Sequence, residues 1–357
     1  MKKIGIWAPL RYANYGDDMQ AIAIAKLLQN NGYNVKLFQL DESLAKHYDL
    51  EVANSVDELC RDIKLCIIAG GGLLTPLNIA KRYLKKEYHE YEQDFCDLYS
   101  ASKKYDVKFC AISMGGDGKS RSPYLYYGKG RRDFFASQNF LNGTVRLEGD
   151  IVQMEKFSKT FVYYPDMLFR SSDYFEPILL PSTSKYRVGI NFKKGKYLDE
   201  SLVNDIIEYA HSHDDIEFHF VTTHLEKKGL NYQYLPNVES KNIFIDRYTS
   251  PNQLFGVLAS MDIFITSMLH LGLTGLSMKT PFLCYRGPGK TKSFLNSIGG
   301  DWAIVDDHIS FSELHSLYFS QNREKLYEQY NIEKLNLMME QSSKHYDFCL
   351  DIASKFA

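Results

Sequence analysis

Residues 262–277 read DIFITSMLHLGLTGLS, an apolar run that passes directly into a segment rich in small residues. The run 262–266 predicts a buried strand, and the spacing after it predicts a helix over 271–278. His270 lies at the junction of the two. Amides at the start of a helix attract anions, and a histidine can donate or accept a proton near neutral pH. The segment therefore indicates an α/β unit with a candidate site at its strand end.

The same alternation extends through the second half of the chain. Apolar runs predict strands at 187–192, 216–222, 242–245 and 282–285, and helical spacing predicts helices at 199–211 and 251–259. Strands that alternate with helices predict a parallel sheet covered on both faces. Arg286 and Lys290 follow the strand 282–285 and place cations at its end, and His224 follows the strand 216–222.

A similar series occupies the first half. Strands are predicted at 4–8, 35–40, 65–69 and 107–113, with helices at 21–28 and 88–99 and shorter strands at 144–147 and 161–164. Between 166 and 186 the periodicity fades into a segment with several Ser and Pro residues, which predicts a linker. We expect two Rossmann-like domains facing across a cleft, 1–175 and 186–335, and a C-terminal helix at 336–357 that can pack back on the first.

The loop after the first strand reads Asn14-Tyr15-Gly16-Asp17-Asp18. It lacks the G-x-G-x-x-G pattern of dinucleotide-binding loops. Asp17 can cap the following helix, or its carboxylate can accept a proton from a sugar hydroxyl at the mouth of the strand. Both interpretations stay open.

Two glycine-rich loops, Gly70-Gly71-Gly72 and Gly115-Gly116-Asp117-Gly118, follow consecutive predicted strands. Glycines there let backbone amides approach a ligand, or let two chain segments cross tightly without one. Because the pattern occurs twice, we expect these loops to face a ligand. Arg146 either pairs with a local carboxylate such as Glu148 or points into the cleft to bind an anion. Pro165-Asp166 is either a simple turn or part of the same strand-end cluster.

The composition excludes several classes of protein. With 42 Lys+Arg against 44 Asp+Glu, the chain of 357 residues lacks the basic excess of a nucleic-acid binder. Its six cysteines form no C-x-x-C pair, and His, Asp and Glu show no metal-ligand spacing, so we expect reduced thiols and no bound metal. No apolar run is long enough for a membrane span or a signal peptide, so we expect a cytoplasmic protein.

These motifs, taken in order, resemble the polysaccharide pyruvyl transferase family. The matching residues are Asn14-x-Gly16-Asp17, Gly70 to Gly72, Arg146, Pro165-Asp166 and the His270 segment with Pro281, Tyr285 and Lys290. The resemblance implies a GT-B-like fold and transfer of pyruvate from phosphoenolpyruvate, used as co-substrate without a cofactor, to two hydroxyls of a saccharide. The product is a cyclic ketal on a cell-surface polysaccharide or its lipid-linked precursor, and phosphate is released.

The resemblance also implies roles for individual residues. His270 would be the acid and Asp17 the base or hydroxyl anchor, while the donor would be held by Arg146, Lys290, Arg286 and Gly272. The acceptor or cleft loops would comprise Asn14, Gly16, Gly70, Gly71, Gly72, Gly115, Gly116, Asp166 and His224. The family usually has an arginine two residues before the histidine, and this chain has Met268. Either the remaining cations and helix amides hold phosphoenolpyruvate, or the chain uses another donor.

Two other functions stay open. One is a GT-B-like glycosyltransferase with a nucleotide-sugar donor, and the other is a glycan-binding protein without catalytic activity. Two basic clusters, Lys81-Arg82-Tyr83-Leu84-Lys85-Lys86 and Lys129-Gly130-Arg131-Arg132, either contact anionic lipid at the inner face of the membrane or are solvated surface.

Overall fold

The computed structural model describes residues 2–75, 86–116, 127–194, 198–226 and 233–357. The chain divides into two compact units. Unit 1 comprises Met1–Ala13, Asp17–Met167 and Glu340–Ala357, and unit 2 comprises Asn14–Gly16 and Leu168–Met339. The chain therefore leaves unit 1 before the predicted domain end at 175, and its last residues belong to that unit.

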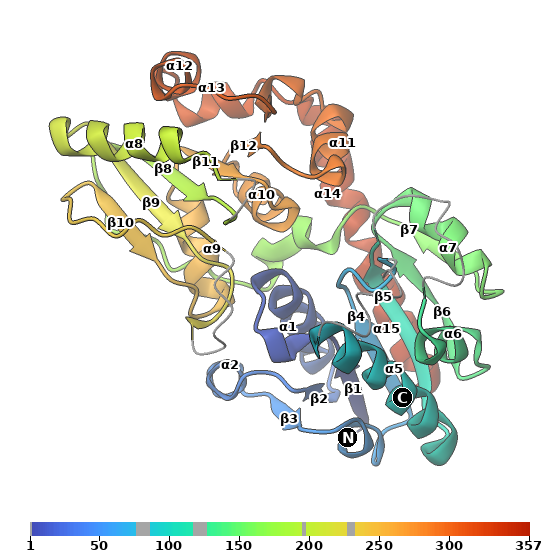
Figure 1. The fold of residues 1–357 in the computed structure, drawn as a ribbon. Helices are drawn as coiled ribbons and strands as arrows, with labels where there is room; N and C mark the ends of the chain where they lie inside the picture. The colour runs from blue at the N-terminus through green and yellow to red at the C-terminus, as the bar shows by residue number, and fades with distance from the viewer. Residues whose placement is uncertain (1, 76–85, 117–126, 195–197, 227–232) are drawn as a thin grey trace. The chain divides into compact units, whose positions relative to one another are not determined.

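Unit 1 is built on a seven-stranded parallel sheet in the order β3-β2-β1-β4-β5-β6-β7 (Figure 1). The strands are β1 (Lys3–Trp7), β2 (Asn34–Phe38), β3 (Glu51–Ala53), β4 (Leu65–Ala69), β5 (Lys108–Met114), β6 (Phe140–Val145) and β7 (Phe161–Tyr163). Every residue of β4 is buried, as expected for a central strand covered on both faces. The strand order reverses between β1 and β4.

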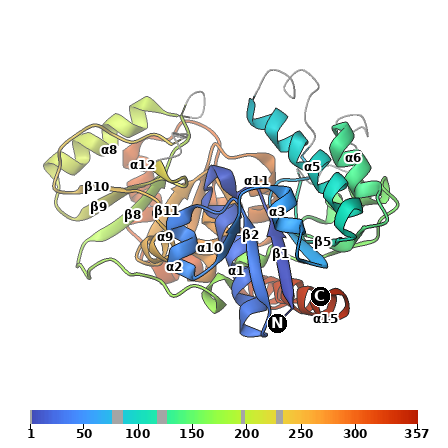
Figure 2. The same ribbon diagram turned by 90° about the horizontal axis from the view of Figure 1, so that it is seen from below.

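Helices cover both faces of this sheet. They are α1 (Tyr15–Asn30), α2 (Glu42–Tyr48), α3 (Val56–Cys60), α5 (Lys86–Tyr105), α6 (Lys129–Ala136), α7 (Ile151–Glu155) and α15 (Lys344–Phe356). Phe95 of α5 packs against Phe134 of α6, and Phe134 packs against Phe109 of β5. Figure 2 shows α15 on the opposite side of the sheet from α5 and α6. There α15 lies against β5 and β6.

Unit 2 repeats the architecture with a six-stranded parallel sheet, ordered β10-β9-β8-β11-β12-β13. Its strands are β8 (Tyr186–Asn191), β9 (Ile216–Val221), β10 (Ile243–Asp246), β11 (Ile263–Thr266), β12 (Phe282–Tyr285) and β13 (Ile304–Val305). Its helices are α8 (Glu200–Ser212), α9 (Pro251–Ala259), α10 (Leu269–Ser277), α11 (Gly289–Ser297), α12 (Phe311–Leu314), α13 (Arg323–Tyr327) and most of α14 (Ile332–Ser342). The predicted fold class, two parallel sheets with helices on both faces, is confirmed.

The strand order reverses between β8 and β11 in unit 2, as it does between β1 and β4 in unit 1. At such a reversal the loops leaving the two central strands diverge, which leaves room for a ligand beyond their carboxyl ends. In unit 2 the helix α10 begins at Leu269, earlier than predicted, so His270 lies within its first turn. The candidate residues of both units therefore lie in loops that follow strands at or near the reversal of the strand order.

The basic cluster at 129–132 contains one buried cation. Arg131 is fully buried, lies over the rings of Tyr91 and Tyr127, and forms an ion pair of 2.6 Å with Glu92. Lys129 is exposed but pairs with Asp133 at 2.6 Å. Arg131 therefore supports the core and is not available to lipid, while the lipid contact at 129–132 stays one of the two predicted alternatives. The cluster at 81–86 lies outside the described residues except for Lys86.

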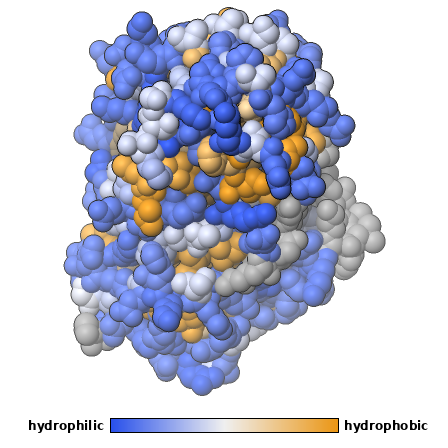
Figure 3. All heavy atoms as spheres, turned by 90° about the vertical axis from the view of Figure 1, so that its left-hand side faces the viewer, coloured by the Kyte–Doolittle hydropathy of each residue, from blue (hydrophilic) through white to orange (hydrophobic). Residues whose placement is uncertain are grey.

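Among the described residues, none of the helices combines the length and hydropathy needed to cross a bilayer. The face drawn in Figure 3 is largely hydrophilic, and its apolar areas are separated by polar residues.

Gly143 provides a test of the packing of unit 1. A Cβ there would collide with the Ala111 carbonyl oxygen and lie 2.7 Å from a ring carbon of Phe161. Because the obstructing oxygen belongs to a neighbouring strand, we expect Gly143→Ala to lower the free energy of unfolding by about 2 kcal/mol in urea denaturation. Gly72→Ala is the matched control, since its nearest neighbour would be the Thr75 hydroxyl at 3.4 Å. Equal losses in both variants would contradict the close approach.

Candidate functional site

Arg146 follows β6 directly and forms a buried ion pair with Asp166. Its Nη1 lies 3.3 Å from Asp166 Oδ2, and the side chains are only 4% and 5% exposed. Of the two predicted alternatives, pairing with a carboxylate is the one observed, and the partner is Asp166 rather than Glu148. Two charges buried away from water are stable only when they pair with each other and form further hydrogen bonds. The neighbouring residues must supply those bonds.

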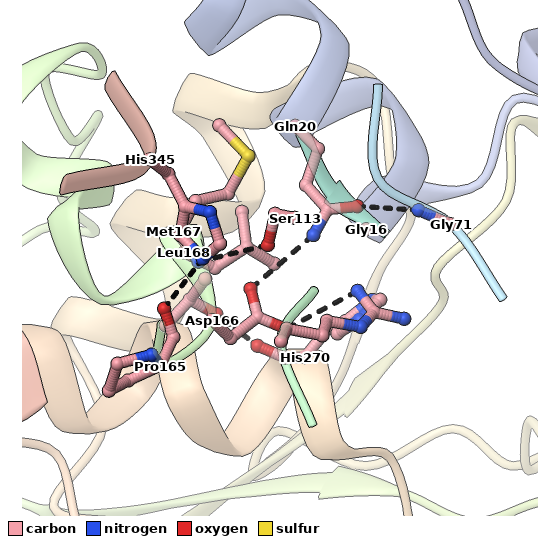
Figure 4. A network of polar contacts seen from close by, with 12 residues as sticks. Gly16, Gln20, Gly71, Ser113, Pro165, Asp166, Met167, Leu168, His270 and His345 are labelled. Atoms are coloured by element: carbon pink, nitrogen blue, oxygen red, sulfur yellow. Dashed lines mark hydrogen bonds and ion pairs between the residues drawn. The ribbon is translucent and has the colours of Figure 1, made fainter. Parts of the chain in front are cut away.

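Gln20 links Asp166 to the first glycine loop. Its Nε2 donates to Asp166 Oδ1 at 3.3 Å, and its Oε1 accepts from the Gly71 amide at 2.9 Å (Figure 4). Sequence reasoning missed this residue. It could have been found as a glutamine within the apolar face of a predicted helix. Such a glutamine is buried, here fully, and needs polar partners inside the protein.

The amides of both glycine loops bind acceptors inside the protein. Gly70 N donates to Ile112 O at 2.8 Å, Gly115 N to Gly71 O at 3.0 Å, and Gly116 N to Asp150 Oδ2 at 2.7 Å. With Gly71 N on Gln20, four amides are engaged. For these four amides the tight chain crossing is the observed alternative, and a ligand-facing role of the loops as a whole stays a prediction. Asp117 and Gly118 lie outside the described residues.

The glycines are required because other side chains approach them closely. A Cβ at Gly70 would collide with the Gln20 amide, and one at Gly115 would collide with the Arg146 guanidinium. A Cβ at Gly71 would lie 3.5 Å from Asp17 Oδ1, which places that carboxylate beside the loop. The loops thus let Gln20, Arg146 and Asp17 come together at the carboxyl edge of the sheet.

In unit 2, Gly16 and His270 are in direct contact. A Cβ at Gly16 would collide with His270 Nδ1, so only glycine fits beside that ring. The segment is held in place by Tyr15 N, which donates to Thr223 O at 2.8 Å, and by Tyr15 OH, which donates to Thr274 Oγ1 at 3.1 Å. The N-terminal motif and the histidine segment, far apart in sequence, therefore meet.

Asn14, not Asp17, caps the start of α1. Its Oδ1 accepts from the Gly16 amide at 3.0 Å. Asp17 lies inside the first turn, so the capping interpretation of Asp17 is wrong. The position still suits a carboxylate, because the positive end of the helix dipole favours a negative charge there.

His224 is the side-chain partner of Asn14. Its Nε2 lies 3.0 Å from Asn14 Nδ2 and its Nδ1 lies 3.1 Å from Thr223 Oγ1. Burial lowers the pKa of His224 to about 4, so the ring is neutral at pH 7. A neutral ring that carries its proton on Nδ1 accepts from Asn14 and donates to Thr223. We assign His224 to holding the Asn14 motif in place.

Met268 occupies a neutral environment. Its Sδ accepts from Thr223 Oγ1 at 3.8 Å and from Gln233 Nε2 at 4.0 Å. The sequence did not reveal these two contacts, because Thr223 and Gln233 lie 45 and 35 residues before Met268. At the N-cap of α10, Met268 makes no side-chain capping bond. This position thus contributes no positive charge.

Gly272 does not offer its amide to a ligand. Its N–H donates to Met268 O at 3.2 Å inside α10, and a Cβ there would lie 2.5 Å from a ring carbon of Phe282. The expected role of Gly272 in binding the donor is therefore wrong, because it is a packing residue. The first-turn residues Leu269, His270 and Leu271 remain the ones whose amides lie at the positive end of the helix.

Arg286, at the end of β12, pairs with Asp199 at 3.2 Å and is 28% exposed. Asp199 also accepts from Tyr285 OH at 2.8 Å, contacts His308 Nδ1 at 2.9 Å and caps α8. Burial alone would raise the pKa of Asp199, but hydrogen bonds from His308, Ser201 and Tyr285 hold it well below its usual value. Lys290 lies in the first turn of α11. Unit 2 thus places two cations beyond the carboxyl end of β12.

No metal centre emerges from the described part of the chain, where no three His, Cys, Asp or Glu residues form a group suited to a metal ion.

Residues 153–287 match the model of the polysaccharide pyruvyl transferase family. The matched stretch contains Asp166, His224 and His270, and the resemblance read from the sequence is confirmed over it. No curated protein sequence matches the chain.

Solved structures show the fold. A UDP-GlcNAc 2-epimerase from Neisseria meningitidis bound to UDP-GlcNAc is 11% identical, with a TM-score of 0.58, over 98% of this chain and 100% of that one. The MnaA protein of S. aureus with UDP is 9% identical, with a TM-score of 0.59, over 98% and 97%. The glycosyltransferase SnogD from Streptomyces nogalater is 11% identical, with a TM-score of 0.53, over 99% of each chain. The expected GT-B-like fold is confirmed.

The neutral His224 predicts an acid-sensitive contribution to stability. Its pKa is about 4 in the folded chain against about 6.5 for an unperturbed histidine, so the unfolded chain binds the proton first as the pH falls. Between those values the free energy of unfolding should therefore decrease, by up to about 3 kcal/mol for this residue.

His224→Gln removes the titrating group and keeps an acceptor for Asn14. We expect the variant to lose less stability than the wild type when urea denaturation is compared at about pH 7 and about pH 4. His345, whose pKa is also lowered, is present in both proteins and cancels in the difference. Identical pH dependence in the two proteins would show that His224 is not buried in its neutral form.

Proposed function

We propose that this chain transfers pyruvate from phosphoenolpyruvate to two hydroxyls of a saccharide, forming a cyclic ketal and releasing phosphate. The observation that carries the proposal is the contact between Gly16 and His270, which joins two of the motifs on which the resemblance to the pyruvyl transferase family rests. The family match over 153–287 supports a transferase of this kind. The acceptor belongs to a polysaccharide or its lipid-linked precursor.

The chemistry requires proton movement and an anion site. A proton is added to the methylene carbon of phosphoenolpyruvate, two sugar oxygens bond to its central carbon with loss of their protons, and the carbon–oxygen bond to phosphate breaks. His270 delivers the proton to carbon, Asp17 accepts the proton of one sugar hydroxyl, and the proton of the other hydroxyl leaves with the phosphate. Because His270 lies in the first turn of α10, the helix amides beside it favour the negatively charged substrate.

Arginine and lysine bind the carboxylate and phosphate of the donor. We assign this role to Arg146, Arg286 and Lys290, since guanidinium groups match such oxyanions with paired hydrogen bonds. Arg146 and Arg286 each have a carboxylate partner that fixes the orientation of the guanidinium. Such preorganisation lowers the cost of binding.

The assignment of His270 is tested by turnover. Phosphate release and the ketal methyl signal in NMR are measured with phosphoenolpyruvate and a panel of saccharides. We expect His270→Ala to lower kcat by about a hundredfold or more. His211→Ala is the control, because His211 is exposed on α8 and only contacts the Glu239 carbonyl. A His270→Ala variant with wild-type turnover would rule out the acid role.

A second candidate, a glycosyltransferase with a nucleotide-sugar donor, is favoured by the neutral surroundings of Met268. Thermal shift separates the two, because a ligand at about a hundred times its Kd stabilises the folded chain by about 2.7 kcal/mol. We expect phosphoenolpyruvate to raise Tm and UDP-sugars to leave it unchanged. The opposite pattern supports the glycosyltransferase, and stabilisation by saccharides alone supports a binding protein.

A further inference from the structure

The C-terminal helix α15 reaches the segment that carries Asp166. His345 Nε2 lies 3.0 Å from the Pro165 carbonyl oxygen, and Tyr346 OH donates to the Met167 carbonyl oxygen at 3.1 Å. These two carbonyls belong to the residues on either side of Asp166. Adjacent side chains of one helix therefore hold the backbone on both sides of the carboxylate, and Figure 4 shows His345 beside Pro165.

His345 is also bound from its other ring nitrogen. Its Nδ1 lies 2.6 Å from Thr144 Oγ1, and Thr144 Oγ1 accepts from the Ser113 amide at 2.9 Å. His345 is fully buried, and burial lowers its pKa to about 3, so the ring is neutral. A neutral ring protonated on Nε2 donates to Pro165 and accepts from the Thr144 hydroxyl. Each donor in this network then has one acceptor, from β5 through β6 and α15 to Pro165.

Ser113 of β5 also contacts the segment 165–167. Its φ of 54° lies in the left-handed region, and the pairing of β5 with β6 shifts register around it. A bulge of this kind turns backbone groups away from the regular ladder, and it persists where other contacts hold it. Here the Ser113 amide turns to Thr144, and its hydroxyl accepts from the Met167 amide at 3.3 Å.

The segment 165–167 is thus fixed by hydrogen bonds from β5 and α15, all within unit 1. Its side chain at Asp166 pairs with Arg146 and Gln20. A small rotation of this backbone would lengthen the ion pair, because the carboxylate has no flexible stem to compensate. The orientation of the Arg146 guanidinium consequently depends also on His345, Tyr346 and Ser113, which hydrogen-bond the backbone beside Asp166.

We infer that His345 is a positioning residue for the Arg146–Asp166 pair, acting through the Pro165 carbonyl, and that Tyr346 supports it at Met167. The inference rests on the proposed function in so far as Arg146 binds the donor. A replacement at His345 should therefore weaken binding of phosphoenolpyruvate while the folded core persists.

The binding experiment compares three variants by calorimetric titration with phosphoenolpyruvate. We expect His345→Ala to raise Kd roughly tenfold or more, because a buried carbonyl and hydroxyl lose their partners. His345→Gln, which keeps a donor for Pro165, should recover a large part of the affinity. Cys349→Ala is the matched control, since Cys349 is a fully buried residue of the same helix. Its Kd should stay within about twofold of wild type, as expected of a change remote from the site.

A crystal structure of each variant separates this inference from the proposed function. We expect the Arg146–Asp166 distance to increase in His345→Ala and to stay at the wild-type value in His345→Gln and Cys349→Ala. If His345→Ala does not fold, Tyr346→Phe provides the comparison, because it removes only the hydroxyl that binds Met167. An unchanged ion pair in folded His345→Ala or Tyr346→Phe overturns the inference. Absence of phosphoenolpyruvate binding in the wild type rejects the donor assignment, while the crystal structures still decide the positioning role.

Discussion

The buried ion pair between Arg146 and Asp166 is the constraint on which the carboxyl edge of unit 1 depends. Charges withdrawn from water are tolerated only when they are paired and further hydrogen-bonded. Gln20 supplies one of those bonds and connects the carboxylate to the Gly71 amide. The close approach of Arg146 to Gly115 then excludes any side chain there. One electrostatic requirement thus accounts for a glutamine, a glycine loop and the anchoring of the segment that bears Asp166.

In unit 2, the ion pair of Arg286 with Asp199 differs from that of Arg146 with Asp166. Asp199 holds Arg286, but it also caps α8 and binds Tyr285 and His308, so several elements share one carboxylate. Arg286 is 28% exposed, whereas Arg146 is only 4% exposed. Burial fixes the geometry of Arg146, and partial exposure leaves Arg286 accessible to a ligand. The two arginines therefore differ in mobility: Arg146 is held in one orientation before a ligand binds, whereas Arg286 can change its partner.

The sequence predicts the architecture well because parallel strands buried on both faces produce short apolar runs. It also brings His270 and the Asn14 motif to strand ends, since that follows from chain order alone. The side chains that pack against the glycine loops were not predicted, because sequence does not show which neighbour approaches a glycine. In Gly70 and Gly115 the neighbour is a side chain of the protein. Gln20, Asp199 and His345 were not found, because each acts through contacts with residues distant in sequence.

The side chains that contact Met268 are uncharged, so they supply no positive charge to a ligand in unit 2. Thr223, Gln233 and a neutral His224 contribute dipoles there, and none of them balances a polyanion. Among the described residues of unit 2, Arg286, Lys290 and the first turn of α10 can then supply positive charge to an anionic donor. Breaking the ion pair between Arg286 and Asp199 costs little free energy, because the carboxylate keeps its other hydrogen bonds. They come from His308, Ser201, Tyr285 and an amide of α8, and they keep the pKa of Asp199 low. Arg286 can accordingly exchange a protein carboxylate for a substrate oxyanion without leaving a buried charge unsatisfied.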